Sequence, residues 1–249
     1  MEITVLGGCG AWPAAGQACS GYLLSHDGFR VVVDIGYATL PRLLEHVPAS
    51  SVDAVVVSHG HPDHCADLNP LLRARALSAS PPAALPVYAL PGALDAVLAL
   101  DRPGMLDSAY RLCEFAAGST FEAGPFRIDT WALPHFRPNA GLRLSAGGHS
   151  VAYTGDTGPS EDVVSLARDA DLFIAEATFP DEVEKQDAPY LSSARQAGEY
   201  ATRAGVGRLL LTHLWPETDP TPYRAAACLS YGGVIGIAGV DTHVIELGT

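Results

Sequence analysis

Basic residues are scarce in this sequence of 249 residues. Lysine and arginine number 15 against 28 aspartates and glutamates, for a net charge of −13. Proteins that bind long RNA or DNA draw most of their affinity from Lys and Arg contacts to phosphates. The composition therefore argues against a long nucleic acid as a partner. It does not exclude a small anion, because a bound dication can make one pocket locally positive.

The chain also lacks a long apolar run, an export signal and paired cysteines. No run reaches membrane-spanning length, and the start, MEITVLGGCG, has no basic segment followed by an apolar one. The cysteines are odd in number and scattered, which argues against a disulfide framework; they are Cys9, Cys19, Cys65, Cys113 and Cys228. We therefore expect a cytoplasmic protein with no membrane partner.

The remaining composition is that of a compact globular protein, with 48% hydrophobic and 17% charged residues. No internal repeat or long linker divides the chain, so we expect one domain over residues 1–249. Strands dominate early, then strands alternate with helices, and this order repeats in the second half. The pattern predicts an α/β fold, a four-layer αββα sandwich with two mixed β-sheets packed face to face and helices outside.

Several predicted strands end at polar residues that can do chemistry. VVVSH (55–59), VAYTGD (151–156), LFIAE (172–176) and LLLTH (209–213) each pass from apolar residues to His, Asp or Glu, and TWALP precedes His135. Functional groups in layered folds collect where loops leave a rigid scaffold. After the first of these strands, CADLNPLLRARALSAS (65–80) predicts a helix that Pro81 and Pro82 stop.

The segment SHGHPDHCADL (58–68) holds His59, His61, Asp63 and His64 within six residues, with Gly60 and Pro62 shaping the turn. Imidazole and carboxylate ligands suit Zn²⁺, with Mn²⁺ or Fe²⁺ as alternatives. Four residues this close cannot all reach one tetrahedral ion, so two adjacent divalent metal ions are the natural interpretation. The alternative is a solvated, histidine-rich turn. His135, Asp156 and His213 are further candidate ligands, because each follows a strand.

These residues carry a resemblance to the metallo-β-lactamase superfamily, whose hallmark is the motif HxHxDH. VLGGCGAWP (5–13), VVVDIG (31–36), YTGDT (153–157) and LLLTH are similar to its other motifs. The resemblance implies that His59, His61 and His135 hold one metal ion, that Asp63, His64 and His213 hold the second, and that Asp156 bridges both. A shared water would then become a hydroxide that attacks phosphorus or a carbonyl carbon. Asp34 would orient a ligand histidine; otherwise it caps a turn.

The segments HFRPNAGLRL, FIAEATF and LTHLWP most resemble the ribonuclease Z branch, which also includes bacterial cyclic-nucleotide phosphodiesterases. Asp156 stands where true β-lactamases commonly use Cys. The resemblance implies hydrolysis of a phosphodiester, and dimers are common in the branch, so a homodimer is an option. Trp12 and Trp215 would face the site and stack on a base, and Arg137 would bind a phosphate oxygen; both roles compete with ordinary packing or solvation.

Two departures from that branch argue against tRNA processing. Only nine residues, 144–152, separate GLR from YTGDT, which leaves room for a hairpin turn but not for the branch's tRNA-gripping arm. The histidine that the branch pairs with Glu176 is absent: Leu191 takes its aligned position, and Ala175 replaces the histidine of HEATF. Asp63, Glu176 or a metal-bound water must then protonate the leaving group, a step that contributes ~10²–10⁴-fold to the rate.

The sequence therefore predicts a hydrolase of a small phosphodiester such as a cyclic nucleotide, with Asp63 and Glu176 as catalytic residues. A lactone or carboxylic-ester hydrolase of the same fold is one alternative, since its leaving group needs less help from an acid. A ribonuclease Z-like RNA 3′-processing endonuclease is another. A non-catalytic metal-binding protein ranks last.

Overall fold

Short runs of Val, Ile and Leu form the strands of two seven-stranded β-sheets in the computed structural model, which describes residues 1–248. The first sheet has the order β14 (Val244–Glu246), β1 (Glu2–Gly7), β2 (Gly21–His26), β3 (Phe29–Ile35), β4 (Ala54–Val56), β5 (Leu85–Ala89), β6 (Tyr110–Glu114). Its pairings are antiparallel from β14 to β3 and parallel from β3 to β6. The sheet is therefore mixed.

The second sheet repeats this plan. Its order is β13 (Val234–Ile237), β12 (Arg208–Thr212), β11 (Leu172–Glu176), β10 (His149–Tyr153), β9 (Asn139–Ala146), β8 (Phe126–Leu133), β7 (Thr120–Ala123). Pairings are parallel from β13 to β10 and antiparallel from β10 to β7. The hairpin between β9 and β10 turns at Gly147 and Gly148, which both have positive φ, as the sequence predicts.

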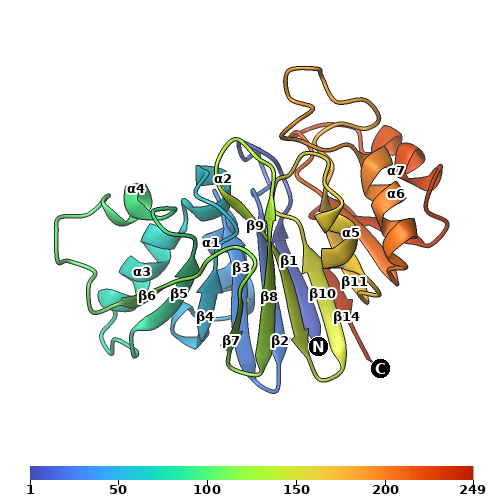
Figure 1. Cartoon of the computed structure of the whole chain (residues 1–249). Helices are drawn as coiled ribbons and strands as arrows, with labels where there is room; N and C mark the ends of the chain where they lie inside the picture. Colours follow the sequence, from blue (N-terminus) through green and yellow to red (C-terminus); the bar gives the residue numbers. More distant parts are fainter. Residues whose placement is uncertain (249) are drawn as a thin grey trace.

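Helices cover the outer face of each sheet (Figure 1). Beside the first sheet lie α1 (Thr39–His46), α3 (Leu68–Ala76) and α4 (Asp95–Leu98), and beside the second lie α5 (Asp162–Ala167), α6 (Ala194–Ala204) and α7 (Thr221–Cys228). A short 3₁₀ turn, η1 (Ala49–Ser51), precedes β4, and α2 (Pro62–Cys65) lies at the upper end of the sheets in Figure 1. The predicted four-layer αββα sandwich is confirmed.

Three apolar cores hold the four layers together. Tyr22, Phe126 and Tyr153 are among the largest fully buried side chains of the core between the sheets. A second core joins the first sheet to α1 and α3, and a third joins the second sheet to α5, α6 and α7. Strands such as β4 are buried on both faces, which explains why VVV reads as a continuous apolar run rather than an alternating one.

The predicted helix over 65–80 is wrong in its extent. It is divided into α2 and α3 at Asp67, whose carboxylate accepts a hydrogen bond from the backbone N–H of Leu40 at 2.8 Å. Its end comes at Ala76 rather than before Pro81. The buried Arg75 donates to the carbonyls of Ala49 and Ala83, both at 2.8 Å, which draws the following chain toward β5.

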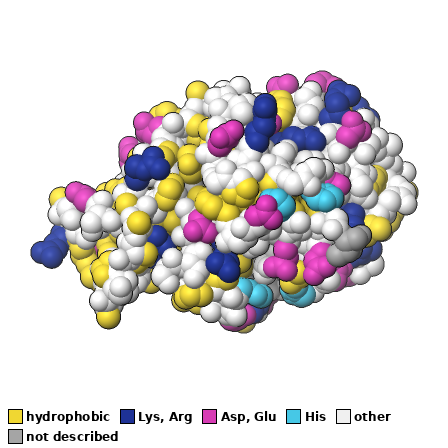
Figure 2. All heavy atoms as spheres, turned by 90° about the horizontal axis from the view of Figure 1, so that it is seen from below, with side chains coloured by type: hydrophobic (Ala, Val, Ile, Leu, Met, Phe, Trp, Pro, Cys, Tyr) yellow, Lys and Arg dark blue, Asp and Glu magenta, His cyan; other side chains and the backbone are white. Residues whose placement is uncertain are grey.

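Among residues 1–248, the structure has no helix with the length and apolar character needed to cross a membrane. Figure 2 shows the end of the molecule opposite to α2, where basic and acidic side chains are interspersed rather than gathered by sign. This face therefore offers no continuous basic surface to a polyanion.

Candidate metal centre

The seven predicted ligands come together at the end of the two sheets that carries α2. His59 follows β4, and Asp63 and His64 lie in α2. His61 is the residue before α2. The other three ligands leave the second sheet, where His135 follows β8, Asp156 follows β10 and His213 follows β12. Each sheet thus contributes part of the cluster, and two of its members, Asp63 and His213, are 150 residues apart in the chain.

The seven side chains form two overlapping groups that share Asp156. One group is His59, His61, His135 and Asp156, and the other is Asp63, His64, Asp156 and His213. In each group the four ligand atoms lie within 4.8 Å of one another. These are the two groups that the family resemblance implies, with Asp156 common to both. That they hold metal ions stays a prediction.

The geometry of the groups fits divalent cations. His61 Nδ1 lies 3.0 Å from His59 Nε2 and 3.0 Å from His135 Nε2, so ring nitrogens converge on one point. In the other group, His64 Nε2 and Asp156 Oδ1 are buried and lie 3.2 Å apart, but neither makes a well-formed hydrogen bond among the described residues. Buried polar atoms of this kind need a partner. Imidazole and carboxylate donors around such atoms suggest a divalent metal site.

The charges within the cluster also favour the binding of cations. Burial alone would raise the pKa of Asp63, but His64 and His213 beside it hold that pKa well below its usual range. Burial alone would lower the pKa of His213, but Asp156 and Asp63 raise it to about 10. The buried carboxylates therefore favour positive charge at the positions where cations would bind.

Asp34 lies behind the cluster and accepts four hydrogen bonds. Its Oδ2 accepts from His64 Nδ1 at 2.7 Å, from the Tyr153 hydroxyl at 2.7 Å and from the Ser58 hydroxyl at 2.8 Å. Its Oδ1 accepts from the Ser58 backbone N–H at 2.7 Å. Because the carboxylate can only accept, His64 Nδ1 must carry the hydrogen, and His64 Nε2 faces the cluster. This is the contact expected of a residue that orients a metal ligand from behind.

Glu176, the last residue of β11, is 1% exposed. Its carboxylate accepts hydrogen bonds from the Thr157 N–H, the Thr178 hydroxyl at 2.7 Å and the Ser192 N–H at 3.2 Å. Burial and the nearby Asp156 carboxylate raise the pKa of Glu176 to about 8, and His213 and the donated hydrogen bonds oppose that rise. Thr178, Ser58 and Ser192 are polar contacts of the site that sequence patterns did not indicate.

The loop between β1 and β2 reaches the cluster directly. The Ala11 N–H donates to Asp63 Oδ2 at 2.8 Å, with Ala11 in the left-handed region at φ 60°. Next to it, Trp12 is 52% exposed and stacks on Trp215, with ring centroids 5.3 Å apart. Trp215 lies two residues after His213, so this tryptophan pair stands beside the group that contains Asp63 and His213.

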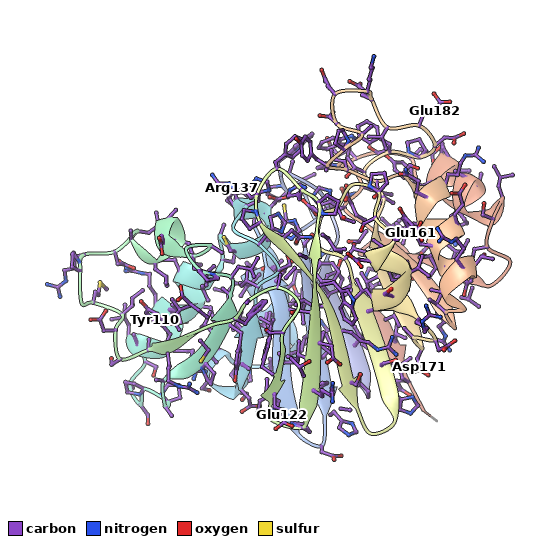
Figure 3. The ribbon with its side chains drawn as sticks, viewed as in Figure 1. Tyr110, Glu122, Arg137, Glu161, Asp171 and Glu182 are labelled. Atoms are coloured by element: carbon purple, nitrogen blue, oxygen red, sulfur yellow. The ribbon has the colours of Figure 1, made fainter. Side chains whose placement is uncertain are left out.

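A second aromatic pair lies beside the other group. Phe136 follows His135 and packs on Tyr190 with ring centroids 4.5 Å apart, and the Tyr190 carbonyl accepts from His135 Nδ1 at 2.9 Å. Figure 3 places Arg137, on the same loop, at the end of the molecule that carries α2. Leu191 is buried, with 7% exposed, and adjoins Ser192, which contacts Glu176.

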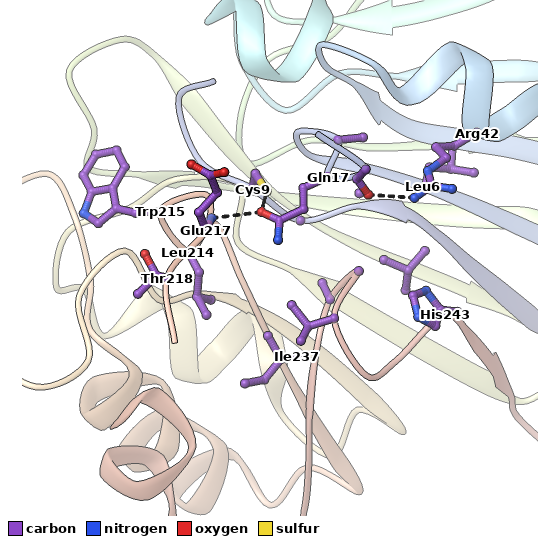
Figure 4. Close-up of a pocket in the computed structure, with 18 of the residues that line it drawn as sticks. Leu6, Cys9, Gln17, Arg42, Leu214, Trp215, Glu217, Thr218, Ile237 and His243 are labelled. Atoms are coloured by element: carbon purple, nitrogen blue, oxygen red, sulfur yellow. Dashed lines mark hydrogen bonds between the residues drawn. The ribbon is translucent and has the colours of Figure 1, made fainter. Parts of the chain in front are cut away.

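A cavity of about 250 Å³ is lined by parts of the β1–β2 loop and of the segment after His213 (Figure 4). Its lining includes Arg42, Gln17, Trp215 and His243, and none of the seven clustered residues. Gln17 Oε1 accepts from the Glu217 N–H at 3.0 Å, which ties the loop to the segment after His213. The cavity borders the candidate centre but is not part of it.

Comparisons with known proteins agree with this geometry. A family model described as a β-lactamase superfamily domain matches residues 29–214. The probable metallo-hydrolase YhfI of Bacillus subtilis is 34% identical over 241 residues, which cover 96% of this chain and 97% of YhfI. A ribonuclease Z of Mycobacterium bovis is 30% identical over 276 residues, covering 99% of this chain and 98% of that protein.

Solved structures show the same fold. The crystal structure of the metallo-β-lactamase fold protein YhfI gives a TM-score of 0.89 at 32% identity, covering 98% of this chain and 99% of that one. Human tRNase Z, short form, gives 0.80 at 23% identity and covers both chains completely. With the family model and the two sequence relatives, these matches identify the chain as a member of the metallo-β-lactamase superfamily and a metal-dependent hydrolase.

Proposed function

We propose that the protein hydrolyses a small phosphodiester, such as a cyclic nucleotide, with two divalent metal ions, of which zinc is the first choice. The observation that carries the proposal is the pair of ligand groups that share Asp156. When bound, two such ions supply a nucleophile from water at neutral pH and stabilise negative charge on the phosphate. His59, His61 and His135 would hold one ion, Asp63, His64 and His213 the other, and Asp156 both.

The residues around the centre would orient the substrate and exchange its protons. Arg137, at the same end of the molecule, would bind a phosphate oxygen, since guanidinium and phosphate pair well. Of the two predicted catalytic carboxylates, Asp63 borders the centre itself, whereas three donors already occupy Glu176. Asp63, which stays ionised, is therefore our candidate for orienting the attacking water and accepting its proton.

The proposal of a small substrate is supported by the turn between β9 and β10. In this chain Gly147 and Gly148 close that hairpin directly, so no arm extends from it. The net charge of −13 also disfavours a long polyanion. The relative named ribonuclease Z lies within the same family, so cleavage of RNA is the activity against which the proposal must be tested.

The exposed tryptophan pair supports a substrate with a planar group. Trp12 lies next to Ala11, which contacts Asp63, and its ring is half exposed. Bases stack on aromatic side chains with about 1–3 kcal/mol each. A nucleobase on Trp12 would place the attached phosphate toward the neighbouring centre.

The test is to assay the zinc-loaded protein on bis(p-nitrophenyl) phosphate, cyclic AMP, an acyl lactone and a pre-tRNA. We expect hydrolysis of both small phosphodiesters and little turnover of the lactone or the pre-tRNA. His135→Ala should abolish this activity. The matched control is His149→Ala, because His149 lies outside the cluster, beside Asp171.

The other outcomes have separate meanings. Faster turnover of the lactone than of either phosphodiester would favour the ester hydrolase. Pre-tRNA cleavage at the rate of an authentic ribonuclease Z would refute the small-substrate proposal. A protein that binds two metal ions and turns over none of the four substrates would be the non-catalytic metal-binding protein.

A further inference from the structure

The hydroxyl of Thr178 lies between two groups that compete for it. Thr178 Oγ1 is 2.7 Å from Glu176 Oε1 and 2.9 Å from His213 Nδ1, and all three side chains are buried. A hydroxyl has one hydrogen to donate. The direction in which Thr178 donates therefore decides whether His213 Nδ1 carries a hydrogen.

We propose that Glu176 is a positioning residue that selects the tautomer of His213 through Thr178, rather than a proton donor to the substrate. A carboxylate only accepts, so it takes the Thr178 hydrogen and leaves the Thr178 oxygen free to accept. His213 Nδ1 must then carry a hydrogen, and the lone pair of Nε2 faces the centre. That Nε2 lies 3.1 Å from Asp156 Oδ2 and 3.2 Å from Asp63 Oδ2. The proposal rests on the proposed metal centre.

The other contacts of Glu176 suit an ionised carboxylate, because both of them are hydrogen-bond donors. Thr157 and Ser192 each approach the carboxylate with a backbone N–H, which can donate but not accept. Thr157 directly follows Asp156, and the Ser192 hydroxyl donates to the Thr157 carbonyl at 2.5 Å. Glu176 therefore holds both His213 and the segment that carries Asp156. Burial and Asp156 raise the pKa of Glu176, and cations at the centre would lower it again and so favour the ionised form.

The same arrangement occurs once more in the first sheet. Asp34 Oδ2 accepts from the Ser58 hydroxyl at 2.8 Å, and the Ser58 oxygen lies 3.1 Å from His59 Nδ1. A buried carboxylate, a hydroxyl and a ligand imidazole thus follow one another in both ligand groups. Two independent chains of this kind, one from each sheet, favour a role in setting the histidine tautomers over a chance contact.

The first test compares Thr178→Val with Thr178→Ser in the full-length protein. Valine has the shape of threonine without the hydroxyl, whereas serine keeps it. We expect Thr178→Val and Glu176→Gln to weaken binding at the ion site that contains His213 by about 10- to 100-fold, as loss of an outer partner commonly does. Thr178→Ser should stay within about threefold of wild type. Thr130→Val is the matched control, because Thr130 is also buried and hydrogen-bonded, to the Ser119 carbonyl, outside the centre.

Three readouts separate the possible roles. Chelator competition gives the affinity of each ion, and the visible spectrum of the Co²⁺-loaded protein reports a changed ligand field. Long-range nitrogen–proton NMR of the zinc-loaded wild-type protein should show a hydrogen on Nδ1 of His213, a measurement that needs no variant to fold. A hydrogen on Nε2, or Thr178→Val with unchanged ion affinities, would overturn the proposal.

The Glu176→Gln variant could also lose turnover while both ion affinities and the Co²⁺ spectrum stay unchanged. This result would overturn the proposal, because it is what loss of a proton donor would produce. A wild-type protein that binds fewer than two ions would instead refute the proposed metal centre. The two failures are therefore distinguishable.

Discussion

Replacing Asp34 by asparagine should separate folding stability from metal affinity. The Asp34 carboxylate is fully buried and accepts four hydrogen bonds, three of them on Oδ2. In the Asp34→Asn variant the amide oxygen can still accept the hydrogen bond from the Ser58 N–H. The amide NH₂, which only donates, takes the place of Oδ2. In the metal-free protein His64 can move its hydrogen to Nε2 and accept from this NH₂ at Nδ1. The hydroxyl of either Ser58 or Tyr153 can likewise rotate and accept the second hydrogen of this NH₂.

The size of both effects follows from these contacts. A hydrogen bond to a charged group is worth about 1 kcal/mol more than a neutral one. Three weakened bonds predict that the free energy of unfolding of the metal-free protein falls by roughly 3 kcal/mol. With an ion on His64 Nε2, the hydrogen must return to Nδ1 and meet the NH₂ of the new amide side chain. This unpaired contact costs about 1–3 kcal/mol, which weakens metal binding by about 5- to 150-fold.

Urea denaturation with a chelator present measures the first effect, and competition with a chromophoric chelator measures the second. Asp53→Asn serves as control, because Asp53 is exposed and accepts one hydrogen bond, from the Arg30 N–H at 2.8 Å. It should change stability by about 0.5 kcal/mol or less. If Asp34→Asn binds two ions as tightly as wild type does, Asp34 does not set the His64 tautomer that metal binding requires.

Three further changes test other parts of the site. Asp156→Ala should lose both ions, because Asp156 belongs to both ligand groups. Metal analysis of the purified variant tests this, and two bound ions would contradict it. Gly10→Ala should weaken binding at the ion site of His213, since a Cβ there would lie 2.7 Å from His213 Nδ1; an unchanged Co²⁺ spectrum would count against this steric effect. Trp12→Ala should raise the KM for cyclic AMP by about 5- to 150-fold with little change in kcat, given the free energy of stacking. Steady-state kinetics decide this, and a fall in kcat alone would remove Trp12 from substrate binding.

His59, His135, Asp156 and His213 were predictable because each follows a strand, and the family motif supplied His61, Asp63 and His64. Val55–Val57 leads to His59, and Leu209–Leu211 leads to His213. Parallel strands of one sheet end on the same side, which brings Asp156 and His213 together after β10 and β12 of the second sheet. His59 follows β4 of the other sheet, so its place beside His213 was implied by the family resemblance. The role of Asp34 was implied by the family resemblance, and its hydrogen bond to His64 is the contact that this role needs.

The hydroxyl contacts could not be predicted in this way. Thr178 and Ser58 lie in loops, where serine and threonine are common, and their partners are set by how loops pack in three dimensions. Three strands, β6, β7 and β13, also escaped prediction. β6, at the edge of the first sheet, is mostly polar or exposed, and β13, at the edge of the second, is short and interrupted by Gly236, so neither shows a clear apolar pattern.

The candidate centre spans the seam between two sheets, so its dimensions depend on how the sheets pack. Two tyrosines cross that seam in opposite directions. Tyr153 of the second sheet donates to Asp34 of the first, and Tyr22 of the first sheet shares a 2.5 Å hydrogen bond with Thr212 of the second. Their rings also meet edge to face, with centroids 5.2 Å apart.

These contacts link the two carboxylate–hydroxyl–imidazole chains into one structure. Asp34 is bonded across the seam by Tyr153, and Thr212, held by Tyr22, directly precedes His213 and pairs with Glu176 in the sheet. A shift of one sheet against the other would therefore move the two ligand groups apart and break buried hydrogen bonds at the same time. The cost of breaking them keeps the spacing of the two groups fixed, which a shared bridging ligand such as Asp156 requires.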